Sequence, residues 1–588
     1  MGTPNHDPPS SPISRPPKIA KMEDAIDISE ATTALAVASA PSSRATPIPS
    51  GGRPDAKARR YDRQLRLWAS TGQRSLESAR ILLIGDDASG CQTLKNLVLP
   101  GIQHFSILSD RNTTPTDVAT NFFLEASSVS KSIALEEVRL LRELNPAVDG
   151  KARIANATEL LASEPNFFLS FTLIIASNVP PKLEEDLAEL LWHTSATVGQ
   201  PDIPLVSIRT SGLTGRMQIQ LREHCVGDTH PDTTHTLRID QPFPALESYA
   251  RKLDIEAMDS MDHSHIPWVV LLVRAACLWK DSHDGKLPSS SEDKADFKKL
   301  LTSWRRKGDE ENFDEALAQA YRVWTSSALP YDIADLLREP SIATVSHNSK
   351  NLHLLLHALS RFLGAAPHLP PVSPSLPDMH SSTQSYVMLQ NLYKQQYFDD
   401  LTKYSSFLAQ VLQENELSVD AIPANEIESF VKNVGGVAII KGSPISATKA
   451  YEGGMKERIA EDFAFGAEPT IGICLVLAIL ASEQFYKVFG RWPGSEAGDI
   501  DMDVAEVERF ATKALTTVHI DAGELPEEMD NAITEVVRGG FLTPPTTAAF
   551  FGGIAAQEVI KLVTNQYNPL DNTAVVDLVK SGVDKFKL

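Results

Sequence analysis

The most constraining feature of this sequence is the apolar run Ala-Arg-Ile-Leu-Leu-Ile-Gly at residues 79–85. Such a run is typical of a buried strand in a parallel sheet, because helices cover both faces of that strand. A helix is expected over Cys91–Leu99, where Pro100-Gly101 stops it. Strands expected at 105–108, 173–176, 204–208 and 217–221 then alternate with helices expected at 131–144 and 182–192. The alternation predicts a Rossmann-like α/β domain with a doubly wound parallel sheet.

Helical periodicity replaces this alternation after residue 240. Helices are expected over residues 267–280, 293–306, 310–324, 351–363, 386–412, 426–433, 471–486 and 504–517. A helix at 547–563 and a strand at 573–578 then return to the α/β pattern. We therefore expect the first part of the α/β domain at 59–240, a mainly helical insertion domain at 241–540, and a C-terminal return to the α/β domain at 541–588.

Residues 1–58 are rich in proline, serine and alanine and almost free of aromatic side chains. A segment of this composition buries too little apolar surface to offset the entropy lost on ordering. We expect a disordered tail. Its six basic and six acidic residues cancel, so the net charge of −21 belongs to the folded part.

The excess of acidic over basic residues limits the kinds of molecule that this chain is expected to bind. With 55 basic and 76 acidic residues, the surface repels phosphate backbones, so nucleic acid is not an expected partner. The longest strongly apolar run, Ile471–Ala481, is shorter than the roughly 18–20 residues that span a bilayer. The N-terminus also has no secretory h-region. We expect a cytoplasmic or nuclear protein without membrane contact.

The four cysteines, Cys91, Cys225, Cys277 and Cys474, are far apart, and no two form a C-x-x-C pair. A cysteine-based zinc site is therefore not expected, and no other metal site is predicted. We interpret the cysteines as small buried hydrophobic residues in a reducing compartment. The alternative, a thioester-forming nucleophile, has no support in the residues that flank any of them.

The loop after the first strand reads Gly85-Asp-Asp-Ala-Ser-Gly90. A nucleotide cradle needs glycine at the first, third and sixth positions, so that backbone amides and the helix N-terminus can meet phosphate. Gly85 and Gly90 are present, but Asp87 stands at the third position. A phosphate in this loop would lie a few ångströms from the Asp87 carboxylate. Two like charges at that separation repel each other by about 1–4 kcal/mol. We predict that the loop does not bind nucleotide and that Asp87 and Asp86 cap the following helix instead.

Several segments resemble the adenylating (ThiF-like) domains of the enzymes that activate ubiquitin-like modifiers. They are Tyr61–Trp68, Lys95–Gly101, Asn121–Leu124, Leu144–Pro146 and, most specifically, Ala548–Lys561. Within this family, nearly the whole chain from Arg60 resembles the regulatory subunits of the neddylation-modifier activating enzymes. The segments that carry this likeness are Gln241–Pro244, His263–Trp268, Pro377–Met379 and Gly490–Gly494, together with the helical insert. The resemblance implies a ThiF-type fold with an insertion like a catalytic-cysteine domain, but without the cysteine.

The same resemblance indicates which catalytic residues are missing. Active members hold the ribose with an acid where this chain has Asn112, and reach the ATP phosphates with an arginine where it has Asn121. Their metal-binding aspartate aligns with Asn178, and their catalytic-cysteine motif has no counterpart. The resemblance therefore implies a subunit that has no catalytic residue and binds no cofactor.

One residue is expected to contact ATP all the same. In the family, the arginine that matches Arg63 reaches across the dimer to the ATP bound by the other subunit, as an arginine finger does. The alternative for Arg63 is a solvated helix arginine, and Arg66 is a weaker candidate. Lys131 matches a lysine of the family, and we interpret it as structural. His263 and His265 lack a visible third ligand and are not predicted to bind metal.

The resemblance implies that this chain pairs with a catalytic subunit that binds ATP and Mg. The heterodimer would adenylate the ubiquitin-like modifier, form a thioester and pass the modifier to a conjugating enzyme. Two alternatives stay open: an active adenylating enzyme with an atypical glycine loop, and a helical interaction scaffold with a vestigial nucleotide fold. ATP binding by the isolated chain would favour the first, and failure to form a stable heterodimer would favour the second.

Overall fold

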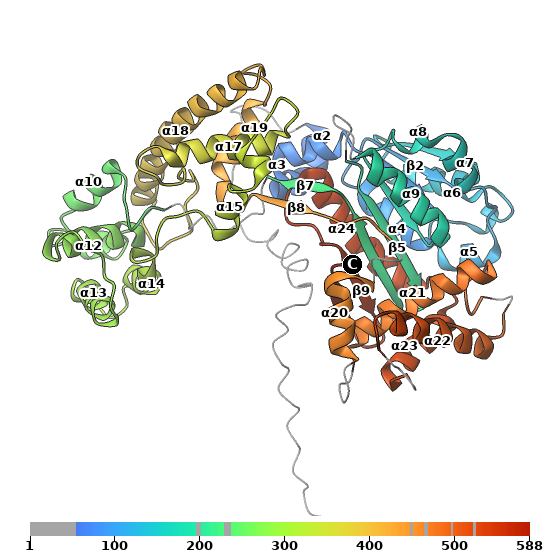
Figure 1. Ribbon diagram of the computed structural model, residues 1–588. Helices are drawn as coiled ribbons and strands as arrows, with labels where there is room; N and C mark the ends of the chain where they lie inside the picture. Colours follow the sequence, from blue (N-terminus) through green and yellow to red (C-terminus); the bar gives the residue numbers. More distant parts are fainter. Residues whose placement is uncertain are drawn as a thin grey trace, which may run out of the picture.

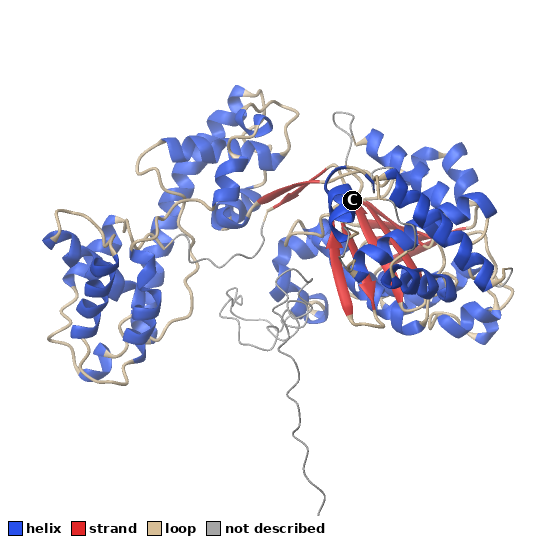
Figure 2. Cartoon of the chain, turned by 60° about the horizontal axis from the view of Figure 1, so that its bottom comes forward, coloured by secondary structure: helices blue, strands red, loops and turns tan. Residues whose placement is uncertain are grey.

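The computed structural model describes residues 55–195, 202–227, 237–446, 451–463, 469–495, 498–520 and 525–588. These residues form an α/β body around one large sheet and a separate helical body beside it (Figure 1). Two short strands, β7 (Glu223–Val226) and β8 (Ala438–Lys441), pair antiparallel and form the β7–β8 ribbon. Figure 2 shows this ribbon between the two bodies, where the chain passes from one to the other and back.

The large sheet has eight strands in the order β10-β9-β6-β5-β4-β1-β2-β3. Strands β3, β2, β1, β4 and β5 run parallel, which confirms the predicted doubly wound sheet. Strands β6, β9 and β10 extend it antiparallel, which the apolar pattern does not predict. The bounds are β1 (Arg80–Ile84), β2 (His104–Leu108), β3 (Asp149–Arg153), β4 (Leu173–Ser177), β5 (Leu205–Ser211), β6 (Thr214–Gln220), β9 (Thr573–Asp577) and β10 (Gly582–Phe586).

Helices cover both faces of the large sheet. Alternate side chains of β1 point to opposite faces, so Ile81 and Leu83 join one apolar cluster and Leu82 and Ile84 another. The first cluster includes α3 (Asp62–Leu76), α4 (Ala88–Val98), α6 (Ile133–Leu144) and α24 (Pro545–Thr564). The second includes α7 (Ala157–Ser163), α8 (Pro165–Phe168) and α9 (Pro181–Thr194). The first strand is therefore buried on both sides, as its composition predicts.

A third group of helices packs against strands β9 and β10. It comprises α20 (Gly453–Asp462), α21 (Ile471–Phe489), α22 (Ile500–Thr517) and α23 (Glu527–Gly539). By length and composition α21 could cross a membrane, but thirteen of its residues are buried in this cluster or against its neighbours. We therefore assign α21 to the core of the α/β body.

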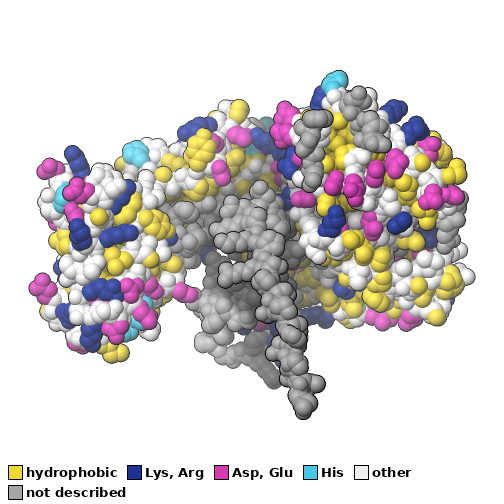
Figure 3. Space-filling model, turned by 90° about the horizontal axis from the view of Figure 1, so that it is seen from below, with side chains coloured by type: hydrophobic (Ala, Val, Ile, Leu, Met, Phe, Trp, Pro, Cys, Tyr) yellow, Lys and Arg dark blue, Asp and Glu magenta, His cyan; other side chains and the backbone are white. Residues whose placement is uncertain are grey.

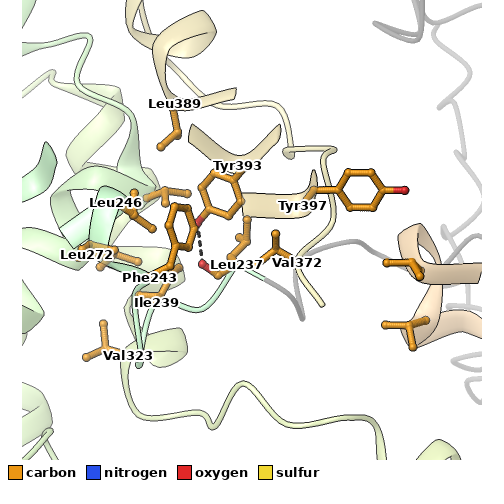
Figure 4. Packing of buried hydrophobic residues seen from close by; sticks show 14 of the residues in the cluster. Leu237, Ile239, Phe243, Leu246, Leu272, Val323, Val372, Leu389, Tyr393 and Tyr397 are labelled. Atoms are coloured by element: carbon orange, nitrogen blue, oxygen red, sulfur yellow. Dashed lines mark hydrogen bonds between the residues drawn. The ribbon is translucent and has the colours of Figure 1, made fainter. Parts of the chain in front are cut away.

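The helical body has its own core, which runs from Leu237 to Val437. At its centre the Tyr393 ring meets the edge of Phe243, with 5.2 Å between the ring centroids (Figure 4). The Tyr393 hydroxyl donates to the Leu237 carbonyl at 2.6 Å, so this buried polar group is satisfied. The helices are α10 (Pro244–Lys252), α11 (Ser260–His263), α12 (Trp268–Ser282), α13 (Ser291–Ser303), α14 (Glu311–Gln319), α15 (Tyr331–Leu336), α16 (Pro340–Ala343), α17 (Asn351–Gly364), α18 (Thr383–Glu414) and α19 (Ala424–Lys432).

Two predicted domain boundaries differ from the packing. Residues 241–540, expected to form one insertion, divide between the helical body and the α20–α23 group, because the latter buries its apolar face against the sheet. The expected tail 1–58 overlaps α2 (Ala56–Arg60), whose N-cap Asp55 accepts a hydrogen bond from the Ala58 amide at 2.6 Å. Residues 1–54 lie outside the described residues.

Charge is spread over the surface. Figure 3 shows acidic and basic side chains intermixed on the face seen from below. Positive charge nevertheless concentrates along α2 and the first turns of α3, where Arg59, Arg60, Arg63 and Arg66 are all exposed. These two helices open the described part of the α/β body.

Candidate functional site

The segments singled out by the sequence meet at the start of α3. Tyr61, just before that helix, is buried, and its hydroxyl accepts a hydrogen bond from the Asn145 side-chain amide at 3.0 Å. A Cβ on Gly101 would lie 2.5 Å from the same hydroxyl, so only glycine allows this approach. Three separate motifs therefore fix how α3 enters the fold.

The arginines of this region differ in their partners. Arg60 donates to the Leu144 carbonyl at 3.0 Å, and Arg66 forms an ion pair with Asp62 at 3.1 Å. Arg63 is exposed, and within the described part of the chain nothing pairs with its guanidinium. Arg63 is therefore available to a group outside this chain.

A kink in α3 sets the direction of the segment that carries Arg63. Ala69 has φ 56° and ψ −176°, which interrupts the helix after Trp68. The Trp68 carbonyl accepts a hydrogen bond from the Gln566 side chain at 3.1 Å, and the Trp68 indole donates to Gln73 at 3.1 Å. The kink is thus held by contacts from both ends of the sequence.

The glycine loop follows β1 and turns into α4. Gly85 has φ +107°, and a Cβ there would lie 2.3 Å from the Ser177 carbonyl oxygen. Asp87 is the N-cap of α4: its carboxylate accepts hydrogen bonds from the amides of Ser89 at 3.2 Å and Gly90 at 3.4 Å. The predicted cap is therefore present. The Asp87 carboxylate thus accepts hydrogen bonds from the amides to which a nucleotide phosphate would otherwise bind.

Asp86, in contrast, makes no cap and points to the end of β2. It accepts from the Ser109 hydroxyl at 2.5 Å and pairs with Arg111 at 2.7 Å. Arg111 also pairs with Asp117 at 3.1 Å. These two carboxylates raise the pKa of Arg111 against the opposing effect of burial. Capping by Asp86 was predicted and is wrong, because Arg111 offers its carboxylate a full positive charge.

Asn178 ties the loop to the C-terminal part of the chain. Its side-chain amide donates to the hydroxyls of Thr210 at 2.9 Å and Thr543 at 3.2 Å, and lies 3.4 Å from an Asp87 oxygen. Thr543 also donates to Asp87 at 3.3 Å. Burial raises the pKa of Asp87, so these neutral donors and the two amides offset only part of the cost of burying its charge.

Two positions of the predicted site remain, Asn121 and Asn112. Asn121 is buried, and its amide donates to Glu137 at 2.9 Å. Burial and nearby Asp86 raise the pKa of Glu137 well above its usual value. Asn112 is exposed and forms an isolated backbone bridge with Ser132. Glu137 is a member of this site that the sequence does not reveal, because it reads as one more polar residue of a helix.

Comparison with known proteins identifies the fold. Residues 61–588 match the ThiF family. The chain belongs to the ThiF family. It is 32% identical over 545 residues to the NEDD8-activating enzyme E1 regulatory subunit of Gallus gallus, covering 91% of this chain and 99% of that one. The Drosophila melanogaster subunit of the same name is 32% identical, over 92% of this chain and all of its own length. The AXL subunit of Arabidopsis thaliana is 33% identical, with 89% and 97% covered.

In this ThiF chain the glycine-loop region holds more acid than base. Asp86, Asp87 and Glu137 surround the N-terminus of α4, and Arg111 is committed to Asp86 and Asp117. Lys131 is exposed and lies 3.9 Å from Glu136, an arrangement that agrees with a structural role. The Asp87 cap supplies acceptors for the first amides of α4 from within the chain.

None of the four cysteines of the ThiF chain has the surroundings of a reactive thiol. Cys91, Cys277 and Cys474 are buried and Cys225 is half-buried. Burial raises the pKa of all four, to about 12 for Cys225 and Cys474. A thioester-forming cysteine must ionise readily and be accessible. The burial of Cys91, Cys277 and Cys474 therefore agrees with the sequence-based interpretation of buried hydrophobic residues, whereas Cys225 is half-buried beside Glu223.

His263 and His265 lie in the helical body, away from the glycine loop. His263 is buried 2.7 Å from the Glu310 carboxylate. The His265 ring nitrogen Nδ1 donates to the Met261 carbonyl at 2.7 Å. The two rings thus have separate partners, and they do not form a site together.

Proposed function

We propose that this chain is the regulatory subunit of a heterodimeric activating enzyme for the modifier NEDD8. Its catalytic partner binds ATP and Mg, adenylates the modifier and carries it as a thioester to a conjugating enzyme. This chain completes the heterodimer, contacts the modifier and lends Arg63 to the partner's ATP site. The complex works in the cytoplasm or the nucleus.

The observation that carries this proposal is the position of the Asp87 carboxylate. It accepts hydrogen bonds from the α4 amides that would otherwise face a phosphate. A triphosphate brought to the same amides would meet the Asp87 carboxylate that already accepts from them, and Asp86 precedes it in the chain. Because the amides of its own loop are already hydrogen-bonded to Asp87, the chain is proposed to act through a partner that has a phosphate-binding loop.

The proposed role of Arg63 rests on its exposed guanidinium, which has no partner among the described residues. Its neighbours Arg60 and Arg66 have partners within the chain, whereas Arg63 is exposed and unpaired among the described residues. A charge-assisted contact to phosphate contributes about 1.5–3 kcal/mol. Removing such a contact slows adenylation by roughly tenfold or more.

The test is reconstitution with the catalytic subunit, followed by ATP–pyrophosphate exchange and thioester formation with NEDD8. We expect Arg63→Ala to reduce the exchange rate at least tenfold and to leave the heterodimer intact. Arg66→Ala is the matched control on the same helix and should exchange like the wild type. An exchange rate of Arg63→Ala equal to that of the wild type, in an intact heterodimer, would refute the role of Arg63.

Two further measurements decide between this function and its alternatives. Titration of the isolated chain with Mg·ATP should give no heat of binding, whereas micromolar affinity would identify an active adenylating enzyme. Co-expression with the catalytic subunit should give a stable heterodimer. If the two chains do not associate, the interaction scaffold is the better description.

A further inference from the structure

The β7–β8 ribbon carries a group of side chains unrelated to the glycine loop. Glu223 and Cys225 are two residues apart on β7, so both point to the same face of the ribbon. His353, in the first turn of α17, packs against that face. Their ligand atoms all lie within 4.8 Å of one another. The group therefore lies where the helical body joins the ribbon (Figure 1).

These three side chains form a donor set that suits zinc. Zn²⁺ binds thiolate, imidazole and carboxylate at about 2.0–2.3 Å, which places the ligand atoms of a tetrahedral site about 3.3–3.8 Å apart. The imidazole Nε2 of His353 lies 3.1 Å from Glu223 Oε1, and the Cys225 Sγ lies 4.0 Å from the same oxygen. Shifts of a few tenths of an ångström bring both into range, and the remaining pair, Cys225 Sγ and His353 Nε2, lies within 4.8 Å, so an approach of at most about 1 Å completes the set.

The group also contains polar atoms that lack good partners. The His353 side chain is nine-tenths buried, and its Nε2 makes no hydrogen bond, although it lies close to Glu223. A buried polar atom left in this state is uncommon and points to a missing ligand. Burial raises the pKa of the Cys225 thiol to about 12, although the nearby Lys350 ammonium opposes this shift.

One cation already competes for this position. Lys350 Nζ lies 3.0 Å from Glu223 Oε1 and donates to the Glu223 carbonyl at 2.9 Å. The Lys350 side chain is 46% exposed, so it can swing into solvent. Other nearby acids have partners of their own: Glu426 accepts from Asn351, and Asp202 accepts from the Glu223 amide.

We propose that Glu223, Cys225 and His353 bind one Zn²⁺, which displaces the Lys350 ammonium. Binding forms a zinc–sulfur bond and releases the thiol proton to solvent. Three protein ligands leave the fourth position to water. The metal joins α17 to the β7–β8 ribbon and so fixes the helical body against the strands that connect it to the sheet. Sequence spacing does not reveal this site, because His353 lies more than 120 positions after Glu223 and Cys225.

The test uses the full-length chain, freed of metal by a chelator and titrated with Co²⁺ and then with Zn²⁺. We expect one equivalent of Co²⁺ to give a sulfur-to-cobalt charge-transfer band that Zn²⁺ removes. Cys225→Ser should abolish the band, and His353→Ala should weaken binding at least tenfold. Cys277→Ser is the matched control, since Cys277 also lies near a carboxylate but has no histidine beside it, and it should keep the band.

Lys350→Ala is a second test, in which all three proposed zinc ligands are kept. Because it removes the competing cation, Zn²⁺ affinity should rise several-fold, with the melting temperature of the metal-free protein recorded alongside. A wild-type protein that binds no Co²⁺ through sulfur, or a band that persists in Cys225→Ser, would overturn the proposal. Unchanged Zn²⁺ affinity in Lys350→Ala would overturn the part of the proposal in which the metal displaces the Lys350 ammonium.

Discussion

Replacing Asp87 with alanine leaves the first turn of α4 without its cap. The Ser89 and Gly90 amides lose their acceptor, and so do the side chains of Asn178 and Thr543. Loss of an N-cap costs about 0.5–2 kcal/mol. Part of this loss is offset, because the buried carboxylate is itself unfavourable: burial raises its pKa. The hydrogen bonds that Asn178 and Thr543 lose add about 0.5–1.5 kcal/mol each, so we expect a net cost of about 1–2 kcal/mol.

Asparagine at position 87 distinguishes the effect of the N-cap from the effect of the buried charge. Asp87→Asn keeps an oxygen that can accept from the amides and removes the buried charge, so it should be at least as stable as the wild type at pH 7. The sign of the pH effect follows from the raised pKa. The folded state binds the Asp87 proton more tightly than the unfolded state, so this contribution to stability is full below pH 3.8 and falls as the pH rises through the folded-state pKa. Asp87→Asn should remove this fall.

Hydrogen exchange of α4 is the suitable assay, since a chain with two bodies does not unfold in one step. A cost of about 1–2 kcal/mol corresponds to roughly 5–30-fold faster exchange in Asp87→Ala, with no acceleration in Asp87→Asn. Thr114→Ala, which removes the capping box of α5 (Pro115–Thr120), is the control and should accelerate only α5. Equal exchange of α4 in the alanine and asparagine variants would refute the reasoning.

Three other changes probe features elsewhere. Ala69→Gly should raise the denaturation midpoint by an amount equivalent to about 1 kcal/mol, since glycine relieves the positive φ at the α3 kink; a lower midpoint would contradict this. Glu483→Ala should cost about 3–5 kcal/mol because it leaves buried Arg209 and Arg216 without this carboxylate, and a melting temperature equal to that of the wild type would show the ion network to be dispensable. The ion pairs of Glu223 with His353 and Lys350 lower the pKa of Glu223 to about 2, which implies stability that is present above pH 4.5 and lost as the pH falls toward 2. Glu223→Gln should make the melting temperature less dependent on pH between 4.5 and 2. An unchanged dependence on pH would argue against the ion pair of Glu223 and His353.

The sequence predicts the parallel half of the sheet well, because β1, β2, β4 and β5 are apolar on both faces. It misses β3 (Asp149–Arg153), whose residues Asp-Gly-Lys-Ala-Arg carry no apolar pattern. This strand lies at the sheet edge and pairs with β2 alone, so backbone pairing rather than burial defines it. The β7–β8 ribbon is missed for a related reason, since its pairing joins residues far apart in the sequence.

The candidate site shows the same division. The cap at Asp87 follows from local rules and is present. The pairing of Asp86 with Arg111 and the link from Asn178 to Thr543 depend on contacts across 25 and 365 positions, which leave no periodic signal. Asn121 was predicted as the place of a lost arginine. Its hydrogen bond to buried Glu137 is evident only from the packing of α6.

The place of β6 in the sheet has a consequence for synthesis. Strand β6 pairs with β5 on one side and with β9 on the other, but β9 follows it by roughly 350 residues. At about 5–20 residues per second, the ribosome takes roughly 20–70 s to supply that partner. During this time β6 is an open edge that can pair with other chains. We therefore expect the nascent chain to depend on chaperones, or on early binding of its partner subunit, until residue 577 has left the ribosome.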